Sequence, residues 1–565
     1  MLFAEKNICP NVTTLSYDEA CLDVFNNLNE TVTIFGQYEQ CHKCDFMNLT
    51  ELSPLNSTSI RVSTRSPLQL YYLRGKTPNC SFDNLYYEHY LYGWNITDKC
   101  NQPYIKQPAD NAYLPILTAF IVLFCFGTAW YMVKCIYKNS HRLRSLLTWH
   151  SELEDDLGGS TTGSSIVIER SPSIKKHPNR VKSVDVFRGL CIMLMIFVNY
   201  GGGKYWFFGH SLWNGITIAD LVFPWFLWLM GLSLSISLQS KLRRAVPRRQ
   251  LVIQTLRRSL ILIFLGIMIN SNQNTQTIAN LRFPGVLQRI GITYLIVGLL
   301  EVAFTKRIEV DNVSPVQDLK SSWPQWLAVA CLATIHTCVT FLAPVPGCGR
   351  GYLGPGGLDS AGQFRNCTGG VAGYVDRALF GEHMYHRQPR PNTYETRQTF
   401  DPEGLLSTLP AVLTVYLGVQ AGRILNTYQA IRAKAARWMA WGVLLCLLGG
   451  ALCEFKRDDG MIPINKRLWS LSYVFVTAGM AFVIQTCLFL LVDITRKWGG
   501  RPFFYPGMNA LVLYVGHELF RGTFPFAWKP SQTTHGTYLF MNLWGTALWV
   551  SLSIFMYKSN LFLSI

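Results

Sequence analysis

The chain has 565 residues, of which 49% are hydrophobic and only 15% are charged. This composition excludes an ordinary soluble domain and a disordered chain, and it is typical of a protein built into a membrane. The formal net charge is +17, although residues 1–111 carry 8 Lys/Arg against 12 Asp/Glu. We interpret the basic excess of the remaining chain as the positive-inside bias of cytosolic loops, and not as a nucleic-acid interface.

Residues 1–111 are predicted to form a small β-rich lumenal domain. Stretches such as Thr31–Phe35 and Leu68–Arg74 alternate apolar and polar side chains, as half-buried strands do. Glycosylation requires an extracytoplasmic loop, and Asn-x-Ser/Thr sequons are concentrated here. The predicted glycosylation sites are Asn11, Asn29, Asn48, Asn56, Asn79 and Asn95, with a seventh at Asn366 in a later lumenal loop.

The cysteines of this domain indicate an oxidising compartment. An even set of six allows 15 connectivities, among which the sequence does not choose. The predicted disulfide cysteines are Cys9, Cys21, Cys41, Cys44, Cys80 and Cys100, joined by Cys348 and Cys367 in the later loop. Cys41 and Cys44 also resemble half of a zinc site, but the matching half is missing, so a disulfide is favoured and no metal is expected.

Eleven apolar runs are long enough to cross a bilayer. They cover residues 112–136, 184–202, 216–239, 251–270, 285–305, 324–344, 405–424, 436–454, 467–492, 503–520 and 537–557. The fold class is therefore a polytopic α-helical membrane protein of about 11 transmembrane helices. An odd number of spans places the termini on opposite sides of the membrane. Because the glycosylated N-terminal part is expected in the lumen, the C-terminus is expected in the cytosol. We also expect a signal peptide upstream of the lumenal domain.

These runs divide the chain into parts. The first span, 112–136, is followed by a polar cytosolic linker over 137–182, whose composition cannot bury a core. A ten-helix catalytic bundle then covers 183–565. Within it, the Gly- and Pro-rich loop 345–404 is expected to cap the lumenal mouth.

The segment Asn199–Asp220 carries unusual polarity between two apolar runs. His210 is either an interfacial histidine within an aromatic belt or a nucleophile or general base near neutral pH. Asn199 and Asn214 are placed to orient it or to stabilise an oxyanion, and Asp220 to hold its ring. Ionisable groups at a membrane are functional-site hypotheses by default.

Other polar residues lie within or beside the spans. The side predicted to be cytosolic carries Asp185, Arg188, Arg257 and Arg258. Arginines in such places either anchor the helices or capture phosphates. Arg289 is predicted to pair with Asp185 or Asp220 in a structural ion pair. Asn509 and His517 share the tenth run, His517 being either a second acid/base group or a helix-end histidine.

Four motifs occur in order: Ser183-Val-Asp-Val-Phe-Arg-Gly-Leu, Ala219-Asp-Leu-Val-Phe-Pro-Trp-Phe, Phe283-Pro-Gly-Val-Leu-Gln-Arg-Ile and Tyr514-Val-Gly-His. With them the chain resembles the heparan-α-glucosaminide N-acetyltransferase family, the lysosomal transmembrane acetyltransferases. The resemblance is strong over about 183–557 and extends to the layout of the lumenal domain. It implies transfer of an acetyl group from cytosolic acetyl-CoA to the non-reducing terminal glucosamine of heparan sulfate in the lysosome, with His210 catalytic and Asn199 in the same site.

The donor is polyanionic and cannot cross a bilayer, so its phosphates are expected at the basic cytosolic face. We expect acetyl-CoA to be bound by Asp185, Arg188, Arg257, Arg258, Asn214, Arg289, Asn509 and His517. The catalytic set is His210, Asn199 and Asp220, acting by an acetyl-histidine intermediate or, as we favour, by direct attack in a ternary complex. The sequence leaves assembly as a homodimer open.

The alternative from another class is a secondary transporter for a sugar or an ion. A transporter needs polar groups near the bilayer midplane on broken helices. Here the polarity is concentrated at one boundary, which favours the enzyme.

Overall fold

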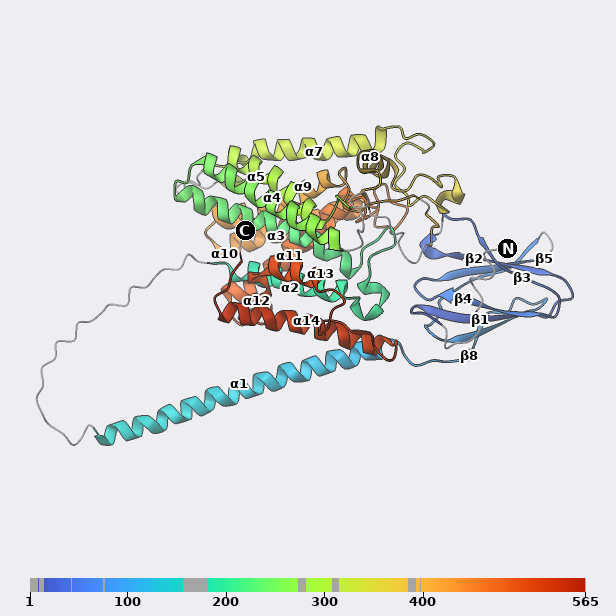
Figure 1. The fold of residues 1–565 in the computed structure, drawn as a ribbon, viewed down its shortest axis with the longest axis horizontal. Coiled ribbons are helices and arrows are strands. Elements are labelled where there is room, and N and C mark those ends of the chain that lie inside the picture. Colours follow the sequence, from blue (N-terminus) through green and yellow to red (C-terminus); the bar gives the residue numbers. More distant parts are fainter. Residues whose placement is uncertain are drawn as a thin grey trace, which may run out of the picture.

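The computed structural model describes residues 9, 15–41, 43–74, 77–155, 180–272, 281–306, 314–384, 393–396 and 398–563. A β-sandwich sits at one end of a helical bundle (Figure 1). We call this the sandwich end of the bundle. The predicted sequon at Asn11 lies outside the described residues. Of the other predicted glycosylation sites, Asn29, Asn48, Asn56 and Asn366 have exposed side chains and Asn95 is half-buried.

The sandwich consists of two four-stranded sheets with the orders β4-β1-β7-β8 and β3-β2-β5-β6. Its strands are β1 (Glu19–Asn26), β2 (Val32–Tyr38), β3 (Met47–Leu52), β4 (Ser57–Ser63), β5 (Leu68–Arg74), β6 (Thr77–Asn84), β7 (Leu91–Ile96) and β8 (Tyr104–Gln107). Strands β1 and β7 run parallel, and the other neighbours are antiparallel. The alternating stretches at Thr31 and Leu68 are indeed strands. Their inward side chains, including Ile34 and Leu70, pack with Trp94 in the sandwich core.

The eight cysteines assigned to the lumenal side form four disulfides. The pairs are Cys9–Cys21, Cys41–Cys44, Cys80–Cys100 and Cys348–Cys367. Cys41 and Cys44 are thus bonded to each other and not arranged as half of a zinc site. The connectivity that the sequence left open follows from the strand arrangement, since the Cys9 amide lies beside β4 and donates to Ser59 O (3.0 Å), next to the β1 strand that carries Cys21.

Helices joined by turns and loops form the bundle. Its helices are α1 (Leu114–Asp155), α2 (Lys182–Asn199), α3 (Ile218–Arg243), α4 (Arg248–Asn272), α5 (Val286–Phe304), α6 (Gln317–Lys320), α7 (Trp323–Leu342), α8 (Gly370–Phe380), α9 (Thr408–Thr427), α10 (Ile431–Leu452), α11 (Leu471–Leu488), α12 (Phe504–Met508), α13 (Ala510–Leu519) and α14 (His535–Lys558). Nine helices of the described chain are long and apolar enough to cross a membrane. The two other predicted runs correspond to α2 and to the pair α12 and α13. The predicted class of polytopic helical membrane protein is therefore confirmed.

Two details of the helices differ from a simple reading of hydropathy. Helix α1 continues to Asp155, so the residues after 136 prolong the first span as helix before the chain leaves the described range. The run 503–520 is broken at Asn509, which ends α12 and precedes α13. An average over the run hides this break because the residues on both sides are apolar.

Helices α3 and α9 cross closely at the centre of the bundle. A Cβ on Gly231 would lie 1.9 Å from the Val415 carbonyl oxygen, and one on Gly418 would lie 1.9 Å from that of Trp228. Small residues at such crossings let helix backbones approach within a membrane. This contact fixes the axis of α3, whose first turn carries part of the site described below.

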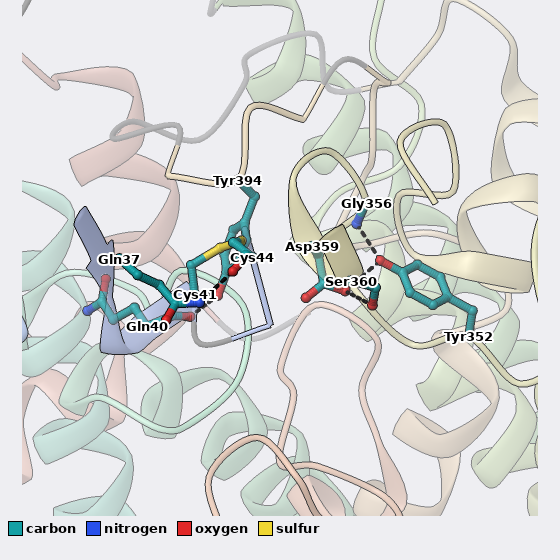
Figure 2. Close-up of a disulfide and its surroundings, with 9 residues drawn as sticks. All are labelled: Gln37, Gln40, Cys41, Cys44, Tyr352, Gly356, Asp359, Ser360 and Tyr394. Atoms are coloured by element: carbon teal, nitrogen blue, oxygen red, sulfur yellow. Dashed lines mark hydrogen bonds between the residues drawn. A yellow bond between two sulfur atoms is a disulfide. The ribbon is translucent and has the colours of Figure 1, made fainter. Parts of the chain in front are cut away.

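The sandwich is attached to the bundle by polar contacts. Lys43 pairs with Asp459 (3.1 Å), and the Tyr394 hydroxyl donates to the carbonyl oxygen of Gln40 (2.7 Å). Figure 2 shows the Cys41–Cys44 disulfide facing the loop that carries Tyr394. At another point Glu88 of the sandwich lies 2.9 Å from His535 Nε2 at the start of α14. The sandwich therefore has fixed contacts with the bundle.

Candidate active site

The segment between α2 and α3 folds back over the sandwich end of the bundle. Gly201, Gly202 and Gly203 all have positive φ angles (123°, 56° and 67°), a conformation that costs other residues energy. A Cβ on Gly202 would lie 2.4 Å from that of Phe208. The triple glycine thus makes a sharp turn, after which the chain reaches His210.

Asp220 closes the same segment as part of a helix cap. Its Oδ2 accepts hydrogen bonds from the amides of Thr217 (3.2 Å) and Ser211 (3.1 Å) and from the Thr217 hydroxyl (2.9 Å). Thr217 and Asp220 form a capping box at the start of α3. In addition, the Tyr473 hydroxyl donates to the Asp220 carbonyl oxygen (2.5 Å). The carboxylate is completely buried and firmly placed.

His210, Asp220 and Lys466 meet in one cluster. His210 Nδ1 lies 2.8 Å from Asp220 Oδ1. Lys466 Nζ lies 3.0 Å from His210 Nδ1, 3.4 Å from His210 Nε2 and 3.3 Å from Asp220 Oδ1. The imidazole is about half exposed, whereas the lysine side chain is largely buried. The predicted pairing of His210 with Asp220 is present in the structure.

This geometry decides which ring nitrogen can act as a base. Nδ1 faces both the buried carboxylate and the Lys466 ammonium, and we assign the ring proton to Nδ1 because the carboxylate is the closer partner and the ammonium can donate to Asp220 Oδ1 instead. Nε2 then keeps its lone pair. A carboxylate that holds imidazole in this tautomer also stabilises the imidazolium formed when the ring accepts a proton.

The charges around His210 favour the neutral ring. The ammonium of Lys466 is the main cause that lowers the pKa of His210 below its ordinary value, and partial desolvation adds to it. Hydrogen bonding and attraction from Asp220, with a smaller attraction from Glu403, act in the opposite direction. The imidazole therefore stays an available base at lower pH than an isolated histidine would.

Replacing Lys466 with glutamine is expected to move the acidic limb of the activity profile to higher pH. Without the ammonium, Asp220 raises the pKa of His210, and the base is protonated earlier as pH falls. Profiles of kcat/KM from about pH 4.5 to about 7.5 would show activity lost at the acidic end by about tenfold and largely kept at the neutral end. Lys466→Arg keeps the charge and serves as the control. Superimposable profiles for Lys466→Gln and the wild type would contradict this role.

Asn199, the last residue of α2, lines the same cavity as His210 and Asp220. Its Nδ2 donates to His517 Nε2 (2.9 Å) and to Glu518 Oε1 (2.9 Å), while His517 Nδ1 lies 3.0 Å from the Leu513 carbonyl oxygen. His517 is fully buried. The structure thus brings His517 to Asn199 at the sandwich end, away from the basic recess described below.

A cavity of about 580 Å³ opens at the sandwich end. Asn199, His210 and Asp220 line it together, and the loop expected to cap the bundle contributes Phe400, Pro402 and Glu403. Six basic side chains also line it: Arg65, Lys204, Arg282, Lys466, Arg467 and Arg521.

Of the described residues, only two carboxylates, Asp220 and Glu403, line the cavity with these cations. Arg282 binds Asp401 (2.6 Å and 2.8 Å) and Glu403 (2.6 Å). Burial raises the pKa of the Glu403 carboxyl, but the positive charges of Arg282, Arg289 and Lys466 outweigh this and hold that pKa below its ordinary value. Asp220 and Glu403, the two carboxylates lining the cavity, are therefore ionised and engaged with cations of the site, and the residues that line the cavity carry more positive than negative charge.

A second basic recess, of about 500 Å³, lies between α3, α4 and α5. Lys241, Arg257 and Arg258 line it, and Arg258 stacks over the Tyr294 ring at 4.8 Å. Its lining residues, all within the described chain, include no carboxylate. Nearby, Asp185 binds Arg180 (2.7 Å) and Arg188 (3.2 Å), and Arg188 also donates to Ser233 (2.6 Å).

The remaining predicted residues lie elsewhere. Asn214 donates to Asp458 (3.0 Å) in a separate recess at the sandwich end, and Asn509 donates to the Leu561 carbonyl oxygen (3.0 Å) near the C-terminus. The predicted pairing of Arg289 with Asp185 or Asp220 is wrong. Arg289 is buried and donates to the carbonyl oxygens of Pro402 (2.9 Å) and Gly404 (3.1 Å) and to the Ser407 hydroxyl.

Sequence reasoning missed Lys466 and Glu518. Lys466 stands immediately before the run 467–492, at the end predicted to be lumenal. Basic residues on that side depart from the positive-inside bias, but Lys456, Arg457 and Arg467 lie in the same loop, so this departure marks the loop and not Lys466 itself. Among the described residues, no three of His, Cys, Asp and Glu are grouped as metal ligands would be.

The helical bundle and the cluster of titratable groups at its mouth together are the features of a membrane-embedded enzyme. A family model described as "Heparan-alpha-glucosaminide N-acetyltransferase, catalytic" matches residues 180–310. Proteins named heparan-alpha-glucosaminide N-acetyltransferase from Mus musculus and Homo sapiens are 37% and 38% identical to the chain over 594 and 590 residues. These alignments cover 97% of the chain and 89% and 88% of the relatives.

The chain therefore belongs to the heparan-α-glucosaminide N-acetyltransferase family, and it is a transmembrane acetyltransferase. The transporter alternative is not favoured.

Proposed function

We propose that this chain transfers the acetyl group of cytosolic acetyl-CoA to the non-reducing terminal glucosamine of heparan sulfate in the lysosomal lumen. The relatives carry this acceptor and reaction in their name. In this proposal the sandwich end faces the lumen and the C-terminus faces the cytosol. Residues 1–111 form the lumenal domain, 112–136 the first span, 137–182 the cytosolic linker and 183–565 the catalytic bundle with its cap loop 345–404.

The observation that carries the proposal is the cluster of His210, Asp220 and Lys466 in a cationic cavity at the mouth of a membrane bundle. N-acetylation of an amine needs a base that is unprotonated under the working conditions. A lysosomal lumen is acidic, so an ordinary histidine would be largely protonated there. The Lys466 ammonium beside the ring supplies a physical reason why His210 stays usable.

The chemical step moves one acetyl group and one proton. The glucosamine nitrogen, once deprotonated from its ammonium form, attacks the thioester carbonyl, a C–N bond forms and the C–S bond breaks. His210 Nε2 accepts the proton released from nitrogen, Asp220 stabilises the resulting imidazolium, and the proton can then pass to the departing thiolate. Asn199, which lines the same cavity, is assigned to substrate positioning.

A ternary complex fits this site better than an acetyl-histidine intermediate. His210 is about half exposed, so water has access to an acetyl group attached to it. Direct attack avoids that loss because donor and acceptor are held together. If the purified enzyme retained radiolabelled acetyl in the absence of acceptor, the intermediate would be established instead.

The recess between α3, α4 and α5 is assigned to the phosphates of acetyl-CoA. Arg257 and Arg258 lie about 14 Å along α4 from its first residue, which is deep for arginines that only anchor a helix. Guanidinium groups without a lining carboxylate require an anion, and phosphates satisfy them well. This supports the predicted binding roles of Arg257 and Arg258. Donor binding is not assigned to Asn214, Arg289, Asn509 or His517, which lie outside this recess.

Replacing Arg258 with glutamine is expected to raise the KM for acetyl-CoA about tenfold while leaving kcat within about twofold, because a charged hydrogen bond contributes about 1.5–3 kcal/mol. Initial rates at saturating acceptor measure this. S-acetylpantetheine, which lacks the nucleotide phosphates, should react equally well with variant and wild type. Arg249→Gln, at the exposed start of α4 and outside the recess, is the matched control. An unchanged KM would remove the recess from the donor site.

Transfer across a sealed membrane tests the proposed function. The protein is reconstituted into liposomes that enclose a glucosamine-terminated oligosaccharide, and radiolabelled acetyl-CoA is added outside. We expect N-acetylated oligosaccharide inside the vesicles, formed by the molecules whose cytosolic face points outward. Acetylation that requires donor and acceptor on the same side would contradict the proposal.

A further inference from the structure

The mouth of the active-site cavity is assembled from three distant parts of the chain. Arg65, which connects β4 to β5 of the sandwich, lines it together with Lys204 of the glycine turn and Arg521 beyond α13. The sandwich therefore contributes a charged side chain to the same cavity as His210.

Arg65 is held in a defined position. Its Nε donates to Asp18 Oδ2 (2.9 Å), and its Nη2 lies 2.8 Å from the same oxygen. Asp18 is buried, while Arg65 is partly exposed. A guanidinium fixed in this way binds an anion at a lower entropic cost than a freely moving side chain.

Lys204 and Arg521 complete the mouth. Lys204 has a positive φ angle (67°) and its ammonium lies 5.1 Å from the centre of the Tyr538 ring. Arg521 lies 3.9 Å from Glu518 and is about half exposed. The two carboxylates that line the cavity, Asp220 and Glu403, have their described contacts with His210, Lys466 and Arg282.

These cations do not serve the acceptor amine itself. An ammonium group is repelled by a positive cavity, and a neutral amine gains little from it. Arg65 and Arg521 have carboxylate partners within the protein and Lys204 has the Tyr538 ring, yet all three line the cavity and can meet an anionic group of the acceptor there. A sulfate or carboxylate carried by the sugar chain has the complementary charge, and arginine matches its planar or tetrahedral oxygens.

We propose that Arg65, Lys204 and Arg521 form a subsite that binds a sulfate or carboxylate of the acceptor saccharide beside its terminal glucosamine. This inference rests on the proposed function. It gives the β-sandwich a part in acceptor recognition, because Arg65 belongs to the sandwich and the other two residues to the bundle.

The test compares two acceptors with the full-length protein. Glucosamine carries the reactive amine without an anionic group, and a sulfated oligosaccharide ending in glucosamine carries both. For Arg65→Gln, Lys204→Gln and Arg521→Gln, the KM for the sulfated oligosaccharide is expected to rise about tenfold each, while kcat/KM for glucosamine stays within about twofold. Lys99→Gln, an exposed sandwich residue outside the cavity, is the control and should change neither.

Two further measurements keep the test decisive. Arg65→Lys preserves the charge if Arg65→Gln fails to fold, and Lys204→Gln does not disturb the Arg65–Asp18 pair. The affinity for a fluorescently labelled sulfated oligosaccharide, measured without acetyl-CoA, reports on the subsite separately from catalysis. Equal effects on both acceptors, or unchanged oligosaccharide binding in all three variants, would overturn the subsite. A wild type that binds the oligosaccharide but acetylates neither acceptor would leave the subsite supported and overturn the proposed function.

Discussion

Replacing His210 with glutamine is expected to lower kcat for acetyl transfer by about a hundredfold to ten-thousandfold, the usual contribution of a general base. Glutamine retains a polar side chain near Asp220 but has no nitrogen that accepts a proton at working pH. Because the side chain is about half exposed, its replacement should hardly change the stability of the fold. The measurement is kcat with saturating acetyl-CoA and glucosamine, together with the unfolding temperature in detergent.

His89→Gln is the matched control for this experiment. His89 is a partly exposed sandwich histidine whose Nε2 lies 3.2 Å from the Ser16 carbonyl oxygen, and it does not line the cavity. Its replacement should leave kcat unchanged. If kcat of the His210→Gln enzyme stayed within about threefold of the wild-type kcat, another group would have to remove the proton.

Replacing Asp220 with asparagine is expected to reduce both activity and stability. Asparagine offers one oxygen in place of two, so the amides of Ser211 and Thr217 and the Lys466 ammonium lose a charged acceptor. Loss of such charged hydrogen bonds costs about 1–3 kcal/mol. The imidazole also loses the group that fixes its proton on Nδ1, so we expect kcat to fall at least about a hundredfold.

The double variant Asp220→Asn with Lys466→Gln separates the two effects. It removes the buried ammonium that the single variant leaves without a counter-ion, so part of the lost stability should return. Activity should not return, because His210 still lacks its carboxylate. Thermal unfolding and kcat of the single and double variants measure this. A single variant that unfolds at the wild-type temperature and keeps its kcat would show that Asp220 supports neither the cap nor the base.

Local patterns in the sequence were sufficient to predict most of the architecture. Apolar runs predicted the helices because a helix in lipid must satisfy its own backbone, and alternation at Thr31–Phe35 and Leu68–Arg74 predicted strands, which are present as β2 and β5. The break at Asn509 was not predicted, since hydropathy is averaged over the whole run. The disulfide pairs needed the strand arrangement, which no local pattern encodes.

The sequence predicted the part of the site whose residues are close together along the chain, and not the residues that reach it from distant segments. His210 and Asp220 are ten residues apart, and the capping position of Asp220 at the start of α3 brings them together. Lys466 reaches them across 256 residues, and Arg65 reaches the cavity from another domain. Arg289 was expected to find a carboxylate, yet its Nη2 donates to backbone carbonyl oxygens beside α9, because an arginine can use carbonyl groups as acceptors.

The central claim is that His210 at this mouth acts on the acetyl group of acetyl-CoA and the amine of a glucosamine acceptor. The most direct measurement incubates purified wild-type and His210→Gln protein with radiolabelled acetyl-CoA and a glucosamine-terminated oligosaccharide, and then locates the label by mass spectrometry. We predict label on the terminal amine with the wild type and almost none with the variant. Equal labelling of the acceptor by both proteins would contradict the account.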